Sequence, residues 1–240
     1  MNVSEMVADS LKFPFSNVKR LLTLGILMAT SILIIPAILA YGYNLRIIEY
    51  SFKDSNELPP FNEWLNMFVD GLKYIVVIII YRGIPAIIVG IISTIIIMSL
   101  MFSGQLTSLN AFLTTYFQIL FVVGFIIMVF PYILSFIALP HIVKKDKLEA
   151  SVKFKDIFGI IKNIGWVNYI IGVVVLTAFS AVVSALSAIP QLMNMGIITV
   201  YAVAAVVGFF LGSYVSAFSG RFLSLIYNEG IEKVDIETVE

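Results

Sequence analysis

Three long stretches of this chain contain no charged side chain: residues 21–45, 83–143 and 163–220. The second stretch holds 61 residues and the third holds 58. A hydrocarbon core about 30 Å thick is crossed by roughly 20 helical residues, so each of these two stretches is long enough for two crossings and a turn. The distribution of charge therefore predicts an integral membrane protein.

The composition supports this class and excludes several others. Hydrophobic residues make up 60% of the 240 positions and charged residues only 12%, whereas soluble proteins carry about a quarter charged residues. The chain has no Cys and a single His, which excludes disulfide frameworks and Cys-based zinc or redox sites. We therefore expect no cofactor and no metal. Nucleic-acid binding is not expected either, because the net charge is +0.

Helices rather than barrel strands are expected in the apolar stretches. These stretches show no strict alternation of polar and apolar residues, and a helix satisfies its own backbone groups within a bilayer. The predicted fold is therefore all-α, a polytopic helical membrane protein with a single integral membrane domain over residues 1–240. Polar turns at 103–110 and 189–196 divide the two longest stretches. The predicted spans cover about residues 74–102, 112–140, 165–189 and 197–220.

The first apolar stretch, about residues 21–45, leaves two topologies open. Pro36 divides it into halves that are too short to cross a membrane separately. The stretch is either one kinked span or a short hairpin, bent at Pro36, that returns to the same face. A kinked span separates three of the 15 Lys and Arg residues from the other twelve, whereas a hairpin places all 15 on one side. The positive-inside rule therefore favours the hairpin, with both termini cytoplasmic in the cell membrane.

With this first hairpin the chain becomes three helical hairpins, and amphipathic segments precede the second and third. Residues 61–73 and 151–164 both repeat apolar residues at helical spacing, with polar residues on the opposite face. We expect these two interfacial helices to lie in the headgroup plane with their apolar faces in lipid. The alternative is that each one is simply the first part of the span that follows it.

Short motifs in the first third of the chain resemble those of a known family. They are Phe13-Pro14-Phe15, Lys19-Arg20-Leu21-Leu22, Leu58-Pro59-Pro60-Phe61 with Trp64, and Phe68-Val69-Asp70-Gly71-Leu72-Lys73. These motifs are similar to those of the prokaryotic, largely archaeal membrane proteins catalogued as domain of unknown function 4013. The resemblance is sharpest over residues 10–75. It implies a multi-pass membrane protein and assigns no activity, catalytic residue or binding residue.

Five polar residues near or inside the predicted spans are candidate contacts for a ligand or a lipid: Arg82, Gln118, His141, Lys144 and Lys145. Arg82 either binds an anionic group or extends to the headgroups, and Gln118 is suited to a hydrogen bond between helices. His141 has no second ligand residue at metal-binding spacing. Lys144 and Lys145 are expected to contact anionic lipid headgroups on the cytoplasmic face.

The functional expectation follows from two observations: the chain has several long apolar segments suited to a membrane, and few polar residues occur within them. We expect a non-enzymatic scaffold or assembly protein that contacts the lipid bilayer. The alternative is a transporter or channel for a small solute or a lipid, with a path along Arg82 and Gln118. Small residues in segments 178–188 and 202–213 are suited to close helix packing, either within the chain or in a homo- or hetero-oligomer.

An enzyme that acts on lipid headgroups is a third hypothesis. No acidic residue occurs inside the predicted spans, so a Ser, His and Asp set is excluded there and no catalytic residue is expected. Such an enzyme would need polar side chains to converge at the cytoplasmic face. The candidates for that convergence are Glu63, Asp70, His141 and Asp156.

Overall fold

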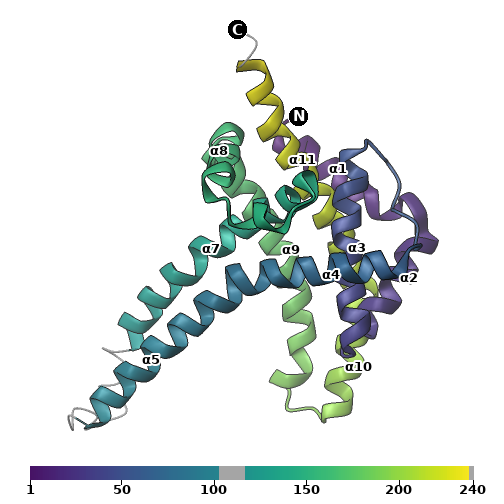
Figure 1. The fold of residues 1–240 in the computed structure, drawn as a ribbon. Coiled ribbons are helices and arrows are strands. Elements are labelled where there is room, and N and C mark those ends of the chain that lie inside the picture. The colour runs from purple at the N-terminus through teal and green to yellow at the C-terminus, as the bar shows by residue number, and fades with distance from the viewer. Residues whose placement is uncertain (103–116, 238–240) are drawn as a thin grey trace. The chain divides into compact units, whose positions relative to one another are not determined.

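The computed structural model describes residues 1–102 and 117–237, which form helices joined by turns, with no strand among them (Figure 1). This confirms the predicted all-α class. The turn predicted at 103–110 and the start of the span predicted at 112–140 lie outside the described residues. The α-helices are α1 Val3–Lys12, α2 Val18–Ala29, α3 Ile34–Phe52, α4 Trp64–Ile78, α5 Ile84–Phe102, α7 Phe117–Lys145, α8 Phe154–Ile164, α9 Trp166–Leu192, α10 Ile197–Val207 and α11 Ser213–Glu237. The shorter elements are the 3-10 turns η1 Phe13–Asn17 and η4 Leu148–Val152 and the π-helical turns η2 Ile79–Gly83 and η5 Gly208–Gly212.

The chain divides into two compact units. Unit 1 comprises Met1–Ile75 and Phe136–Glu240, and unit 2 comprises Val76–Ser135. The sequence shows no boundary at these positions, because the residues on both sides are equally apolar, and the single membrane domain expected over residues 1–240 stays a prediction.

Four helical stretches in the described residues are long and apolar enough to cross a membrane: Trp64–Phe102, Leu120–Lys145, Trp166–Leu192 and Ile197–Glu232. All four overlap the predicted spans, but each one continues beyond the apolar residues into polar sequence. The stretch from Trp64, for example, begins ten residues before the predicted start at 74. Hydropathy locates the apolar centre of a helix, whereas its ends depend on capping and packing that hydropathy does not measure.

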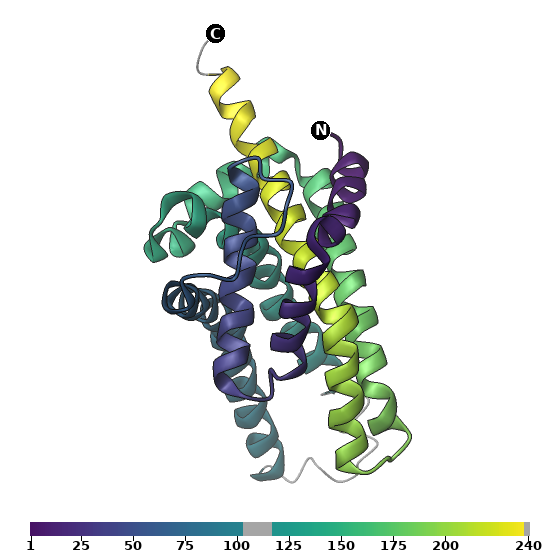
Figure 2. The same cartoon turned by 90° about the vertical axis from the view of Figure 1, so that its right-hand side faces the viewer.

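The first apolar stretch forms a helical hairpin whose bend lies at residues 30–33, where α2 has ended and α3 has not begun. The bend predicted at Pro36 was therefore placed too late in the chain. Pro36 instead occupies the first turn of α3, where its missing N–H removes no intrahelical hydrogen bond. Figure 2 shows α2 and α3 side by side, joined at their lower ends.

The bend of this hairpin lies part of the way along the α9 and α10 pair in unit 1. A Cβ atom added to Gly25 of α2 would lie 2.7 Å from the Phe209 carbonyl oxygen, and one on Gly208 would lie 3.2 Å from the Met28 carbonyl oxygen. The end of α2 therefore packs against η5. Helix α10 begins at Ile197, eleven residues before Gly208, which corresponds to about 16 Å at a helical rise of about 1.5 Å per residue. The bend accordingly stops short of the α9–α10 connection (Figure 2).

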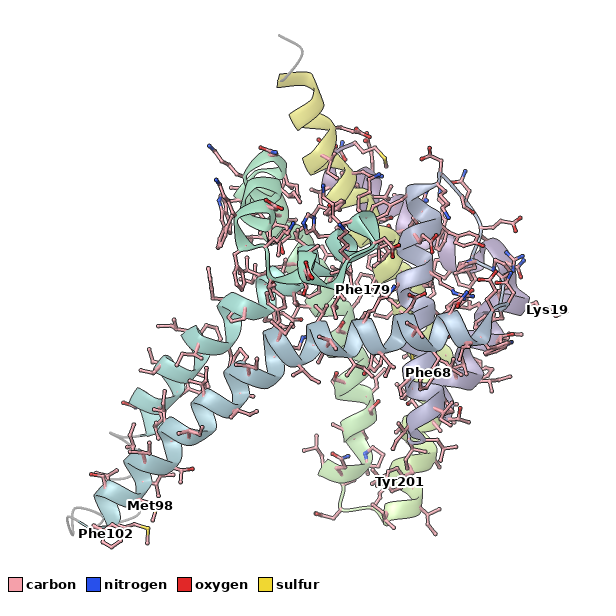
Figure 3. All side chains as sticks on the ribbon, in the orientation of Figure 1. Lys19, Phe68, Met98, Phe102, Phe179 and Tyr201 are labelled. Atoms are coloured by element: carbon pink, nitrogen blue, oxygen red, sulfur yellow. The ribbon has the colours of Figure 1, made fainter. Side chains whose placement is uncertain are left out.

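The polar side chains of unit 1 gather toward the end that contains α1 and α8, far from the α9–α10 connection. In Figure 3, Tyr201 lies near that connection among side chains that are mostly carbon, and Lys19 lies among nitrogen and oxygen atoms. The apolar core of the unit lies between these ends. Buried side chains of η1, α2, α3, α4 and α11 form it, together with the segment before α4. They include Leu24, Tyr43, Ile47, Leu58, Met67 and Ala217.

The two segments predicted as interfacial helices have different outcomes. Helix α4 begins at Trp64 and continues through η2 and α5 without interruption, so most of segment 61–73 is the first part of a 39-residue helix. Helix α8 is a separate element. Its Ile157, Ile160, Ile161 and Ile164 are buried, and Ile160 and Ile164 border Gly230 of α11. The apolar face of α8 was expected in lipid, but its isoleucines pack in the protein beside α11, while Phe154 on the same face is 47% exposed.

Candidate ligand cavity

A cavity of about 540 Å³ lies within unit 1, between the C-terminal half of α3, the segment that leads into α4, and the end of α7. Its walls are unusually polar for a chain of this composition. Three cationic and four acidic side chains line it. The cations are Arg46, Lys53 and Lys73, and the acids are Glu49, Glu63, Asp70 and Asp146.

Arg46 holds two walls of the cavity together. Its side chain is only 6% exposed, and it donates to the Asn62 carbonyl oxygen at 2.5 Å and the Glu63 carbonyl oxygen at 2.8 Å. A third contact reaches Asn62 Oδ1 at 3.3 Å. A buried guanidinium is tolerated only where hydrogen bonds replace its water, and these carbonyls supply them. Arg46 thereby fixes the segment before α4 against α3.

The other cations pair mainly along their own helices. Lys53 Nζ lies 2.6 Å from Glu49 Oε1 on α3, and the hydrogen bond to this carboxylate raises the pKa of Lys53. Lys73 Nζ lies 3.0 Å from Asp70 Oδ1 on α4 and 3.7 Å from Asp146 Oδ1 at the end of α7. Exposed pairs of this kind contribute roughly 0–1 kcal/mol to stability. Their main effect is to orient charged groups around the cavity.

Two lining residues have a backbone conformation that is uncommon for residues with a side chain. Glu63 and Asp146 both have φ of 48°. In the described residues only Asp54 and Asn194 share a positive φ without being glycine. The left-handed conformation costs roughly 1–2 kcal/mol per residue, and such residues are frequent at functional sites. At Glu63 the hydrogen bond from Arg46 to its carbonyl oxygen stabilises this geometry.

The loop between α3 and α4 is held by two further arginines. Arg221 of α11 is 7% exposed and donates from Nη1 to the Ser55 carbonyl oxygen and from Nη2 to Asn56 Oδ1, both at 3.1 Å. Its Nε lies 2.7 Å from Asp9 Oδ2. Arg20 of α2 donates to the Leu58 carbonyl oxygen. The loop that borders the cavity is therefore fixed from α2, α3 and α11.

The five residues singled out from sequence do not line the cavity. Arg82 lies in η2 of unit 2, with its guanidinium 4.8 Å from the centre of the Tyr132 ring. Its Nε atom is buried without a hydrogen-bond partner. Gln118 is exposed on the unit 2 part of α7.

The structure places His141 in a separate buried cluster of unit 1. His141 Nδ1 lies 2.7 Å from the Tyr227 hydroxyl, and Nε2 lies 3.9 Å from Asp156 Oδ2. Lys144 lies 5.1 Å from the centre of the Phe52 ring, and Lys145 is exposed. The contacts at His141 bring together α7, α8 and α11, and its Nε2 atom is buried without a hydrogen-bond partner.

Two of the four groups named for a headgroup enzyme, Glu63 and Asp70, line the cavity. His141 and Asp156 are not part of this lining, and their Nε2 and Oδ2 atoms lie 3.9 Å apart. Within residues 1–102 and 117–237, no three His, Asp or Glu residues are arranged to hold a metal ion. The charged and hydrogen-bonding side chains that line the cavity are suited to contacts with a polar molecule.

Sequence reasoning missed the cavity residues, although they carry a periodic signal. Positions 46, 49, 50 and 53 lie on one helical face, as do positions 63, 66, 70 and 73. The second set was interpreted as the solvated side of an amphipathic helix. Nothing in a single sequence indicates that two such faces meet.

Comparison with known proteins identifies a family but no activity. The family model described as a protein of unknown function (DUF4013) matches residues 26–192. This match begins after the motifs at Phe13 and Lys19 and extends to residue 192. The resemblance seen in the sequence was sharpest over residues 10–75, so the family match covers much more of the later part of the chain. No curated protein and no solved structure matches the chain. Because the matched residues make up more than half of the sequence, the chain belongs to the DUF4013 family of proteins of unknown function.

Proposed function

We propose that this protein is a non-enzymatic, multi-pass scaffold or assembly protein of a prokaryotic cell membrane, and that it binds a small polar molecule or lipid headgroup at the cytoplasmic face. The charged cavity of unit 1 carries this proposal. Its walls come from three helices, and a buried arginine fixes two of them. A cavity that is prepared in this way is typical of a binding site.

The proposed topology places both termini, the loop after α3 and the cavity on the cytoplasmic side, with the α2–α3 hairpin entering the bilayer and returning. The exposed tip of that hairpin supports this arrangement, because Ile32, Leu33, Ile34 and Ile35 are between 59% and 78% exposed. Such a run of exposed aliphatic residues is suited to lipid. The tip stops about 16 Å before the α9–α10 connection, which is about half of a hydrocarbon core.

Cysteine labelling tests the topology, because the natural chain has no Cys. We expect Gln191→Cys to react with an impermeant maleimide added to intact cells. Lys12→Cys, Ser55→Cys and Lys147→Cys should react only after permeabilisation. Reaction of position 12 but not 55 from outside would show that the first stretch crosses the membrane once.

Ligand retention tests the binding function. The protein is purified in mild detergent, and the bound small molecules and lipids are identified by mass spectrometry. We expect a polar molecule or lipid that is retained by the natural protein and is depleted in Arg46→Met, which loosens the cavity wall. Lys147→Met, an exposed change outside the lining, is the matched control. Equal retention by both variants would contradict the proposed site.

Transport remains the second candidate because π-helical turns interrupt two of the long helices. These turns are Ile79–Gly83, which contains Arg82, and Gly208–Gly212. Turns of this kind leave backbone groups without their usual helical partners and are frequent at functional sites. Solute flux into proteoliposomes that is lost in Arg82→Met would favour transport over a scaffold.

A further inference from the structure

We propose that the cavity of unit 1 binds a ligand that carries a primary ammonium group. This inference rests on the binding function proposed above and specifies the chemistry of the ligand. It depends on the balance of charge in the cavity, on the hydrogen-bonding capacity that its own contacts leave free, and on its size.

The charge balance favours a cation over an anion. Four carboxylates and three cationic side chains line the cavity, so its walls carry a net charge of −1. An anionic ligand would meet this excess of carboxylates. A cationic ligand would neutralise it.

The contacts within the cavity leave acceptors free on its carboxylates. Both terminal nitrogens of Arg46 donate to main-chain carbonyls, and Lys53 and Lys73 each lie against a carboxylate of their own helix. Glu63, in contrast, has no ion pair among the described contacts. Its Oε2 atom accepts only the amide of Asn66, at 3.0 Å. A carboxylate has about four acceptor positions, so most of the capacity of Glu63 is available to a donor.

The size and the arrangement of the cavity favour an organic ammonium over a metal ion. A volume of about 540 Å³ is far larger than one ion needs. The carboxylates come from α3, from the start of α4 and from the end of α7, and no three of them could hold one metal. A primary ammonium brings three hydrogen-bond donors that these separate acceptors can share.

A quaternary ammonium fits less well. Such a group has no N–H donor and is normally bound by a cage of aromatic rings. Tyr50 is the single aromatic residue in the described lining. The cavity is therefore expected to prefer a primary ammonium, which donates hydrogen bonds, over a quaternary one.

The same chemistry has two sources, a free amine or an aminolipid headgroup. The purified full-length protein in nanodiscs distinguishes them. In the first arm, putrescine and ethanolamine are titrated by calorimetry into discs that contain only phosphatidylcholine, with tetramethylammonium and acetate as comparison probes. In the second arm, retention of phosphatidylethanolamine is compared with retention of phosphatidylcholine after delipidation. Binding in the first arm indicates a free amine, and selective retention in the second indicates a headgroup.

Glu63→Gln tests the site in whichever arm shows binding. Loss of a charged hydrogen bond is expected to weaken the affinity roughly tenfold or more. Glu149→Gln, an exposed change outside the lining, should leave it unchanged. Unchanged unfolding temperatures would show that both variants remain folded.

Three results would overturn the inference. They are equal binding of tetramethylammonium and ethanolamine, preferential binding of acetate, and an ammonium affinity that Glu63→Gln does not change. In these cases the binding function would still stand if another polar molecule is retained and is depleted in Arg46→Met. Absence of any retained molecule, together with no binding in either arm, would overturn both proposals.

Discussion

Gly42→Ala is expected to destabilise the protein by at least about 3 kcal/mol. An added methyl group in a packed core usually costs about 1–3 kcal/mol, and the cost is higher where it overlaps with backbone that cannot move aside. A Cβ atom at position 42 would lie 1.8 Å from the Met67 carbonyl oxygen, and one at Gly71 would lie 2.0 Å from the Ile38 carbonyl oxygen. Helices α3 and α4 therefore touch backbone to backbone at these two glycines. Because no side chain can rotate away, the helices themselves must separate.

Gly159→Ala is the matched control. Gly159 lies inside α8, and a Cβ atom added there would meet nothing within 4 Å. Alanine favours a helix over glycine by roughly 0.8–1 kcal/mol, so this variant should be unchanged or slightly more stable. Thermal unfolding in detergent, followed by circular dichroism, measures both effects. An unfolding temperature for Gly42→Ala equal to that of Gly159→Ala would show that α3 and α4 do not pack as described.

Arg221→Met is the second substitution with a large expected effect, a loss of about 1–2 kcal/mol in the free energy of unfolding. Removal of the guanidinium leaves the Ser55 carbonyl oxygen and Asn56 Oδ1 without this donor, and it leaves Asp9 without its cation. An acceptor that loses its donor costs roughly 1–3 kcal/mol where it is fully buried. Ser55 is half-buried and Asn56 is exposed, so water replaces part of what the guanidinium supplied. Asp9 is 39% exposed, so water replaces much of its interaction and it contributes little to the total.

The loop between α3 and α4 should report this change directly. Hydrogen exchange at residues 54–58 is expected to accelerate in Arg221→Met, and less so in Arg221→Lys, which keeps the charge but not the planar fork of donors. Lys53→Met removes only an exposed pair and should cost less than about 1 kcal/mol. Full protection of the loop in Arg221→Met would mean that other contacts hold it.

The apolar parts of the fold were predictable because bilayer thickness and backbone hydrogen bonding leave few solutions. The four long helices lie where the charge-free stretches indicated. Details that depend on packing were not predictable. The bend at residues 30–33 precedes Pro36, because proline is accepted in the first turn of a helix as readily as it ends one.

The candidate site shows the same division. In the sequence Arg46 and Arg221 are simply two of the 15 cations that the hairpin topology places on one side, yet both are buried and bind loop carbonyls. Their partners are separated from them by 17 and 166 residues, a pairing that no local pattern encodes. His141 was selected as a candidate because it is the single histidine of the chain, but it does not line the cavity.

The arginine contacts also bear on how the α3–α4 loop can evolve. At Ser55, Leu58 and Glu63 the guanidinium groups bind main-chain oxygen atoms, which every amino acid supplies. Mutations that exchange side chains at these three positions therefore keep those acceptors. Related proteins could diversify the rim of the cavity, and with it the molecule they bind, while the same three arginines continue to shape it.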